Sequence, residues 1–189
     1  MRKWIVLMTV FLWVIVAIPT HATTIAMHNY SPQYWGSLTV DFDAKYDWTA
    51  GAGRFYTTID TGEKQIDTFS YCVDLGNYLS WEKEYTAAVS QPTSAYREAA
   101  WLVSHYDPLT GKRYQGQSVT DGEAKSIAMT LQLAIWETLY EDRFFRRDSG
   151  VSGLFDEMMA SLIPIDFVPS GFIVAEISGQ DQLVAAPVP

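Results

Sequence analysis

The stretch that decides the fold is Phe69-Ser70-Tyr71-Cys72-Val73-Asp74-Leu75. Its odd-numbered residues are apolar and its even-numbered residues are small or polar, and this alternation predicts a β-strand with one apolar face. Cys72, the only cysteine of the 189 residues, points away from that face. A cysteine that served only as a core residue would belong on the apolar face. Cys72 is therefore a candidate for chemistry.

On both sides of this stretch the pattern predicts further strands. After irregular residues 23–35, alternation over residues 36–48 indicates a half-buried strand. Ala-Gly-Ala-Gly at 50–53 predicts a turn into a second strand, 54–59, and a second turn at 61–64 leads into a third strand, 65–75. A short strand fits 85–90. These segments predict an antiparallel β layer.

The pattern then becomes helical. We expect helices over residues 94–105, 122–140 and 153–162, and a closing strand over 172–177. Asp121 is the expected cap of the longest helix. The sequence therefore predicts one α+β domain, residues 23–179, with an antiparallel β layer and a helical insert.

Gln132 lies at the centre of the apolar face of the 122–140 helix. At about 100° per residue, its neighbours around the helix include Ala128, Ile135 and Trp136. A buried primary amide needs partners for two donors and a carbonyl, and each group left unpaired costs about 1–3 kcal/mol. Either Gln132 is fully hydrogen-bonded, for example to an edge of the sheet, or its carboxamide has been consumed chemically.

The second alternative involves Cys72. A thiolate is a nucleophile and a carboxamide carbon is an electrophile, so the two groups held together in a dry pocket can condense to a thioester with loss of ammonia. Burial would slow hydrolysis of that bond. The competing interpretation is a hydrogen-bonded Gln132 beside an idle Cys72.

The first 22 residues predict export. Basic Arg2 and Lys3 precede an apolar run, residues 4–18, and Thr20-His21-Ala22 has small residues at its first and last positions, as signal peptidase requires. The run is short for a membrane span. The formal charge is −9, and it becomes −11 once Arg2 and Lys3 are removed. Such an acidic chain is not expected to bind nucleic acid or anionic lipid.

Other chemistry has weaker support. His28 and His105 have no second ligand at metal-binding spacing, so no metal or cofactor is predicted. Cys72 with His105 would form a nucleophile–base pair, which a helix-end histidine near Asp107 explains more simply. An acidic cluster fits a solvated helix face and comprises Glu137, Glu141 and Asp142. A basic cluster fits pairing with nearby acids and comprises Arg143, Arg146 and Arg147.

Three segments together resemble the thioester domains of Gram-positive surface adhesins. They are residues 71–75 (Tyr-Cys-Val-Asp-Leu), 99–102 (Ala-Ala-Trp-Leu) and 131–137 (Leu-Gln-Leu-Ala-Ile-Trp-Glu). The resemblance implies an α+β fold and covalent attachment to a target surface. By position it implies Cys72 and Gln132 as the bonded pair, with Tyr71, Trp101 and Trp136 packing nearby. Leu131 departs from the family pattern, which usually has Thr there.

Residues 180–189 resemble the lead-in to a PEP-CTERM sorting signal, without the Glu-Pro, apolar helix and basic cluster that complete one. The resemblance implies delivery to the cell surface or the extracellular matrix, and we expect no membrane contact for the mature chain except through such a missing anchor.

Three functions follow from the sequence. The first is an exported adhesin, not a turnover enzyme, whose thioester acylates surface protein amines or polysaccharide hydroxyls. The second is a non-covalent polysaccharide-binding module of the same fold. The third is a secreted thiol or carboxylate hydrolase.

Overall fold

The computed structural model describes residues 24–43, 45–80, 83–107, 113–146, 152–162 and 169–186. The expected signal peptide, residues 1–22, lies outside the described residues, as do residues 187–189 of the segment that resembles a sorting signal. Among the residues that are described, no helix has both the length and the apolar character that a membrane crossing requires.

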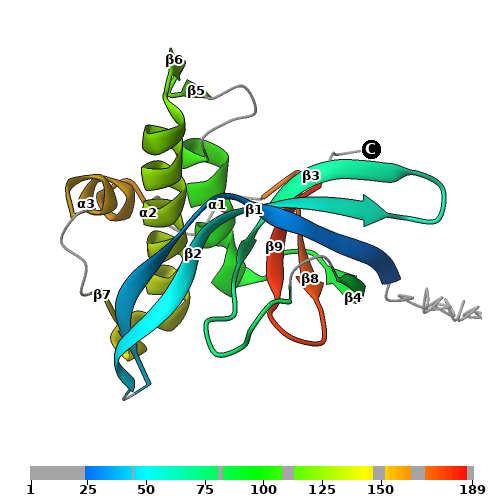
Figure 1. The fold of residues 1–189 in the computed structure, drawn as a ribbon, viewed down its shortest axis with the longest axis horizontal. Helices are drawn as coiled ribbons and strands as arrows, with labels where there is room; N and C mark the ends of the chain where they lie inside the picture. The colour runs from blue at the N-terminus through cyan, green and yellow to red at the C-terminus, as the bar shows by residue number, and fades with distance from the viewer. Residues whose placement is uncertain are drawn as a thin grey trace, which may run out of the picture.

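Six antiparallel strands close into a ring (Figure 1). The order is β2-β3-β9-β8-β4-β1, and β1 also pairs with β2, so the sheet returns to its starting strand. A further strand, β7 (Phe144–Arg146), pairs with the outer part of β1. The ring strands are β1 (Thr24–Phe42), β2 (Lys45–Asp60), β3 (Gln65–Cys72), β4 (Glu84–Ser90), β8 (Phe172–Glu176) and β9 (Gln182–Ala185).

A helical insert separates β4 from β8, as the sequence predicted. Its main helices are α1 (Ser94–Tyr106), α2 (Asp121–Tyr140) and α3 (Ser152–Ala160). Short elements connect them: β5 (Arg113–Tyr114), β6 (Gln117–Ser118), η1 (Glu141–Arg143) and β7 (Phe144–Arg146). The cap of α2 is Thr120 and not Asp121, because Thr120 and Glu123 form a reciprocal capping box. The described residues therefore form an α+β fold, in which three α-helices pack against a closed antiparallel sheet.

The first hairpin differs from the prediction. Residues 24–35, expected to be irregular, belong to β1, and β1 passes into β2 between Phe42 and Lys45 rather than at 50–53. The glycines predicted to form a turn instead allow β1 to approach β2. A Cβ at Gly51 would lie 2.7 Å from Nε1 of Trp35, and Gly53, at φ 141°, leaves room for the carbonyl oxygen of Tyr34.

The end of the domain also differs from the prediction. We expected residues 180–189 to be a tail beyond the domain, but Gln182–Ala185 forms β9 between β3 and β8. Leu183 and Val184 are both fully buried, on opposite faces of this strand. A strand that is buried on both faces does not alternate between polar and apolar residues. The short apolar run 183–186 therefore did not show the alternation that predicts a strand.

The core has three parts. The first lies between the helices and one face of the sheet and includes Tyr71, Trp101 and Leu183. The second lies between α2 and the outer part of the β1–β2 hairpin and includes Cys72 and Trp136. The third comprises Met27, Ile59, Tyr85, Ala87, Ala175, Ile177 and Val184. Cys72 therefore lies inside the packed domain, where strands and helix meet.

Candidate functional site

Gln132 binds the backbone of Cys72. The Cys72 N–H donates to Oε1 of Gln132 at 3.0 Å, and Nε2 of Gln132 donates to the Cys72 carbonyl oxygen at 2.7 Å. Pairing of β3 with β2 ends at Ser70, opposite Phe55, so the β2 side of Cys72 lies beyond the ladder. The Gln132 amide supplies the donor and acceptor that a partner residue in a neighbouring strand would offer. This is the hydrogen-bonded alternative that the sequence left open.

Tyr140 extends the same arrangement two turns further along α2. Its hydroxyl accepts from the Leu75 N–H at 3.0 Å and donates to the Val73 carbonyl at 3.1 Å. Residues eight apart share a helix face, so α2 presents both side chains to the same edge of the sheet. Helix α2 therefore replaces a strand beside the segment that carries Cys72.

On its other side, Cys72 lies directly opposite Gln182 of β9. The backbone groups of Cys72 bond to Gln132, and the adjacent ladder bond runs from Val73 N–H to the Asp181 carbonyl at 2.9 Å. Cys72 and Gln182 are thus a non-hydrogen-bonded pair, the geometry in which opposed residues of an antiparallel sheet come closest, with Cα atoms about 4.5 Å apart. Their side chains share one face.

The Cys72 sulfur is held by two carboxamides. Nε2 of Gln182 donates to Sγ at 3.2 Å, and Sγ–H donates to Oε1 of Gln180 at 2.8 Å. Gln180 is itself fixed, because its Nε2 donates to the Asp74 carbonyl at 2.5 Å. The structure brings Cys72 and Gln132 together as the sequence predicted, but through the Cys72 backbone; the hydrogen bonds of the sulfur go to Gln180 and Gln182 instead.

The Gln182 carboxamide is polarised by a hydroxyl. Ser70 donates to Oε1 of Gln182 at 3.0 Å, and the Ser70 and Thr57 hydroxyls lie 2.8 Å apart. Nε2 of Gln182 also donates to the carbonyls of Gln180 and Asp181, each at 3.2 Å. A donor at the carbonyl oxygen stabilises the negative charge that develops there when a nucleophile adds to the adjacent carbon.

The site is dry. Cys72 is 1% exposed, and Ser70, Gln132 and Gln182 are fully buried. Burial raises the pKa of the Cys72 thiol from 9.0 to about 12; the Gln182 hydrogen bond opposes this rise, and the charge of Asp74 adds to it. The sulfur is therefore a neutral thiol near neutral pH, and its proton is available for the bond to Gln180.

Tyr71, the preceding residue, points to the opposite face and into a buried polar cluster. Its hydroxyl donates to Oδ1 of Asp107 at 2.6 Å, and Nε of Arg54 lies 3.1 Å from the same oxygen. Burial raises the pKa of Asp107 to about 6, against the lowering effects of Arg54 and Tyr71. Tyr71, Asp107 and Arg54 are all deeply buried. Their contacts therefore fix β3 and the residue that follows α1.

The other predicted site residues are divided between the two sides of the sheet. Trp136 is fully buried in the same part of the core as Cys72, whereas Trp101 packs with Tyr71 and stacks on His105, with ring centroids 4.1 Å apart.

The basic cluster is described only in part. Arg143 pairs with Asp43; the side chain of Arg146 and all of Arg147 lie outside what is described. Within the described part of the chain, no three His, Cys, Asp or Glu side chains are grouped to hold a metal ion.

Sequence reasoning missed Gln180 and Gln182. Both lie in the segment assigned to a tail, and neither belongs to the motifs that carried the resemblance. A usable signal was present: the apolar run 183–186 directly follows Gln-Asp-Gln, and a buried strand beginning at a glutamine raises the same question of hydrogen-bond partners as Gln132.

Comparisons with known proteins give one remote similarity. No protein-family model matches the chain, and no curated protein does. Among solved structures, the N-terminal thioester domain of a surface protein from Clostridium perfringens is similar over 85% of this chain and 97% of that chain, with 12% sequence identity and a TM-score of 0.47. A similarity of this size does not carry a function from one chain to the other. The chemistry of the site rests on the contacts of Cys72.

Proposed function

We propose that this chain forms an internal thioester between Cys72 and Gln182 and transfers the Gln182 acyl group to a nucleophile on a target surface. The observation that carries the proposal is the buried cross-strand pair itself, in which the Cys72 sulfur lies 3.2 Å from the Gln182 amide nitrogen. The sequence-based prediction of a Cys72–Gln132 bond is the rival, and the contacts of the sulfur favour Gln182.

The bond-forming step balances without another reactant. The Cys72 sulfur adds to the side-chain carbonyl carbon of Gln182, and the Ser70 hydroxyl stabilises the oxygen as it becomes negative. The thiol proton passes to the amide nitrogen, which leaves as ammonia when the carbon–nitrogen bond breaks. The bond to Gln180 directs S–H away from Gln182 and leaves a sulfur lone pair on the Gln182 side.

The second step consumes the thioester. An amine or hydroxyl of the target adds to the Gln182 acyl carbon, the carbon–sulfur bond breaks, and the proton of the acceptor returns to Cys72. The target is then joined to Gln182 by an amide or an ester, so each chain reacts once and does not turn over. Such a protein acts as a covalent adhesin, and the expected signal peptide would deliver it to surface proteins and polysaccharides outside the cell.

Intact mass spectrometry tests the thioester. The wild-type protein should be lighter than its sequence by one ammonia, whereas Cys72→Ala and Gln182→Ala should have their full masses. Methylamine treatment of the wild-type protein should add one methylamine and free a titratable thiol. Fragmentation of the labelled peptides then locates the methylamide. This measurement uses the wild-type chain, so it does not depend on whether any variant folds.

The location of that methylamide decides between the glutamines. A label on Gln182 supports the proposal, a label on Gln132 restores the rival, and a label on Gln180 assigns the bond to the other carboxamide at the sulfur. A wild-type protein of full mass with a reactive thiol would remove the thioester altogether.

A further inference from the structure

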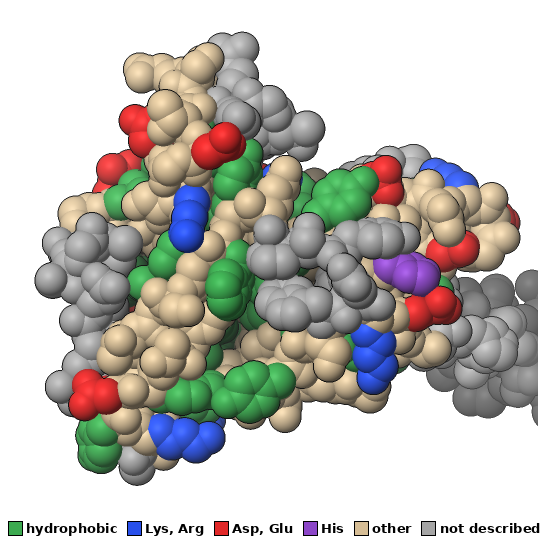
Figure 2. Space-filling view, viewed as in Figure 1, with side chains coloured by type: hydrophobic (Ala, Val, Ile, Leu, Met, Phe, Trp, Pro, Cys, Tyr) green, Lys and Arg blue, Asp and Glu red, His purple; other side chains and the backbone are tan. Residues whose placement is uncertain are grey.

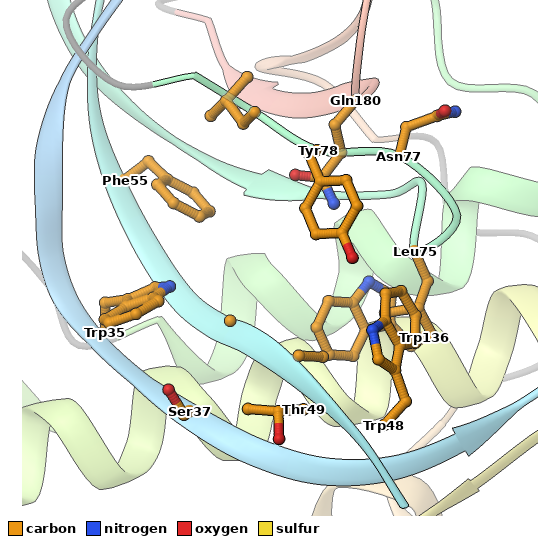
Figure 3. Close-up of a pocket in the computed structure, with 13 residues that line it drawn as sticks. Trp35, Ser37, Trp48, Thr49, Phe55, Leu75, Asn77, Tyr78, Trp136 and Gln180 are labelled. Atoms are coloured by element: carbon orange, nitrogen blue, oxygen red, sulfur yellow. The ribbon is translucent and has the colours of Figure 1, made fainter. Parts of the chain in front are cut away.

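A pocket of about 280 Å³ lies next to the Cys72 site. Figure 3 shows Trp35 and Phe55 on one side of it, Trp48 and Trp136 on the other, and Gln180 and Tyr78 between them. Trp35 and Trp48 come from β1 and β2, and Trp136 comes from α2. Aromatic faces on several sides of one pocket suit a flat, partly apolar ligand.

The polar groups of the pocket are neutral. Ser37, Thr49, Asn77 and Gln180 contribute hydroxyls and carboxamides, and the described lining residues include no carboxylate and no cationic side chain. On the face shown in Figure 2, acidic and basic side chains are scattered among one another and do not gather in one patch. The pocket therefore favours a neutral ligand with several hydrogen-bonding groups, because a charged ligand would lose its solvation there without an opposite charge.

Trp136 narrows the choice of ligand. Trp136 lines the pocket and is fully buried. Its indole Nε1–H has no hydrogen-bond partner among the described residues. An indole nitrogen only donates, so it needs an acceptor; a sugar hydroxyl or ring oxygen has free lone pairs, whereas a lysine ammonium has none. Leaving such a donor unpaired costs about 1–3 kcal/mol. Because the nitrogen has almost no accessible surface, a ligand oxygen would recover this cost only if the side chains that cover the nitrogen move.

Gln180 connects the pocket to the sulfur. Its side chain lines the pocket, and its Oε1 is the atom that accepts the Cys72 S–H bond. A ligand in the pocket would therefore be separated from the reactive bond by one side chain. For a ligand to reach the sulfur and the Gln182 carbon, that side chain would have to leave its hydrogen bonds to Cys72 and to the Asp74 carbonyl.

We propose that this pocket binds a neutral hexose unit of a polysaccharide, stacked between aromatic rings, and presents one of its hydroxyls to the acyl group. This inference rests on the proposed thioester for its covalent step, in which the sugar hydroxyl adds to the Gln182 carbon, the carbon–sulfur bond breaks, and the hydroxyl proton passes to Cys72. Binding itself needs no thioester and is tested separately.

The test uses the full-length Cys72→Ala protein, which cannot form the thioester. Its tryptophan fluorescence is titrated with neutral oligosaccharides of glucose, of mannose and of galactose, and with oligolysine. At least one oligosaccharide should give a saturable change, and oligolysine should give none. Tyr78→Ala, which removes a 76% exposed ring at the pocket, should raise Kd about tenfold, equal to about 1.4 kcal/mol.

Tyr46→Ala is the matched control, because Tyr46 is 71% exposed and lies outside the lining. It should leave Kd unchanged. Equal weakening by both tyrosine variants, binding of oligolysine alone, or no response to any of the three sugars would overturn the pocket proposal. A wild-type protein that has lost ammonia but binds no sugar separates the two proposals: the thioester stands and the pocket does not.

Discussion

Two buried glutamines reach Cys72 from opposite sides, and they do different work. Gln132, from α2, bonds the backbone N–H and carbonyl of Cys72, whereas Gln182, from β9, bonds its sulfur. Both carboxamides are fully buried and hydrogen-bonded. Burial therefore does not distinguish these two amides; the atoms of Cys72 that they contact do.

The difference follows from how each glutamine is delivered. A helix side chain approaches β3 along its open edge, in the plane of the sheet, where backbone groups point. A cross-strand neighbour stands on the same face of the sheet, where side chains point. The first position suits support of the strand, and the second suits reaction with the thiol.

The largest expected effect is on stability. Gln132→Leu leaves the Cys72 N–H and carbonyl buried and unpaired, so the free energy of unfolding should fall by about 2–5 kcal/mol in urea titrations. Gln117→Leu, at an exposed position on β6, should change it by no more than about 0.5 kcal/mol. The folded fraction of Gln132→Leu should still lose ammonia; retention of the full mass in that fraction would reverse the assignment of the two glutamines.

Next in size is the effect of Ser70→Ala on the rate of ammonia loss. The variant lacks the donor to Oε1 of Gln182, so thioester formation after refolding should slow by about a hundredfold. Intact mass measured over time gives the rate. Ser70→Thr keeps a hydroxyl and should recover much of it. A rate that Ser70→Ala leaves unchanged would show that the hydroxyl only packs.

A smaller effect concerns pH. In Gln182→Leu the thiol stays free, and burial keeps its pKa above the 9.0 of an exposed thiol. The folded state then holds the proton more tightly than the unfolded state, so this stabilisation is present below about pH 9 and is lost as the pH rises toward 12. By about pH 10 the loss should reach about 1.4 kcal/mol. The Cys72→Ala, Gln182→Leu double variant should lack it, and an equal pH dependence in both proteins would contradict the raised pKa.

The smallest expected effect is at the second helix-to-strand contact. Tyr140→Phe removes the hydroxyl that joins Val73 and Leu75, but Tyr140 is only half-buried, so water can replace part of the lost bonding. The free energy of unfolding should fall by about 1 kcal/mol. Tyr46→Phe, on an exposed ring, serves as the control. A cost equal to that of Gln132→Leu would mean that the two contacts support β3 equally.

Periodicity predicted the elements that have one clear face. The strand through Cys72 and the helices at 94–105, 122–140 and 153–162 were placed within a few residues, and so was the strand at 172–177. Gln132 was identified as a buried amide in need of partners. These predictions succeeded because each depended on local spacing.

The errors arose where distant contacts decide the structure. Ala50-Gly51-Ala52-Gly53 looked like a turn because glycine is common in turns, but here Gly51 and Gly53 make room for residues of β1. Gln182 was assigned to a tail because nothing near it in sequence shows that it faces Cys72. The resemblance supplied Gln132 as the bonded partner, whereas the register of β3 with β9 places Gln182 opposite Cys72. Which of the two glutamines reacts stays a prediction.

The position of β9 has a consequence for timing. Cys72 and Gln182 are 110 residues apart in the sequence, and they meet only when β9 inserts between β3 and β8. Closing so long a loop is slow compared with forming the local hairpin of β1 and β2. A chain that still lacks β9 therefore has no Gln182 beside Cys72, so the proposed thioester would form only after synthesis and folding are complete.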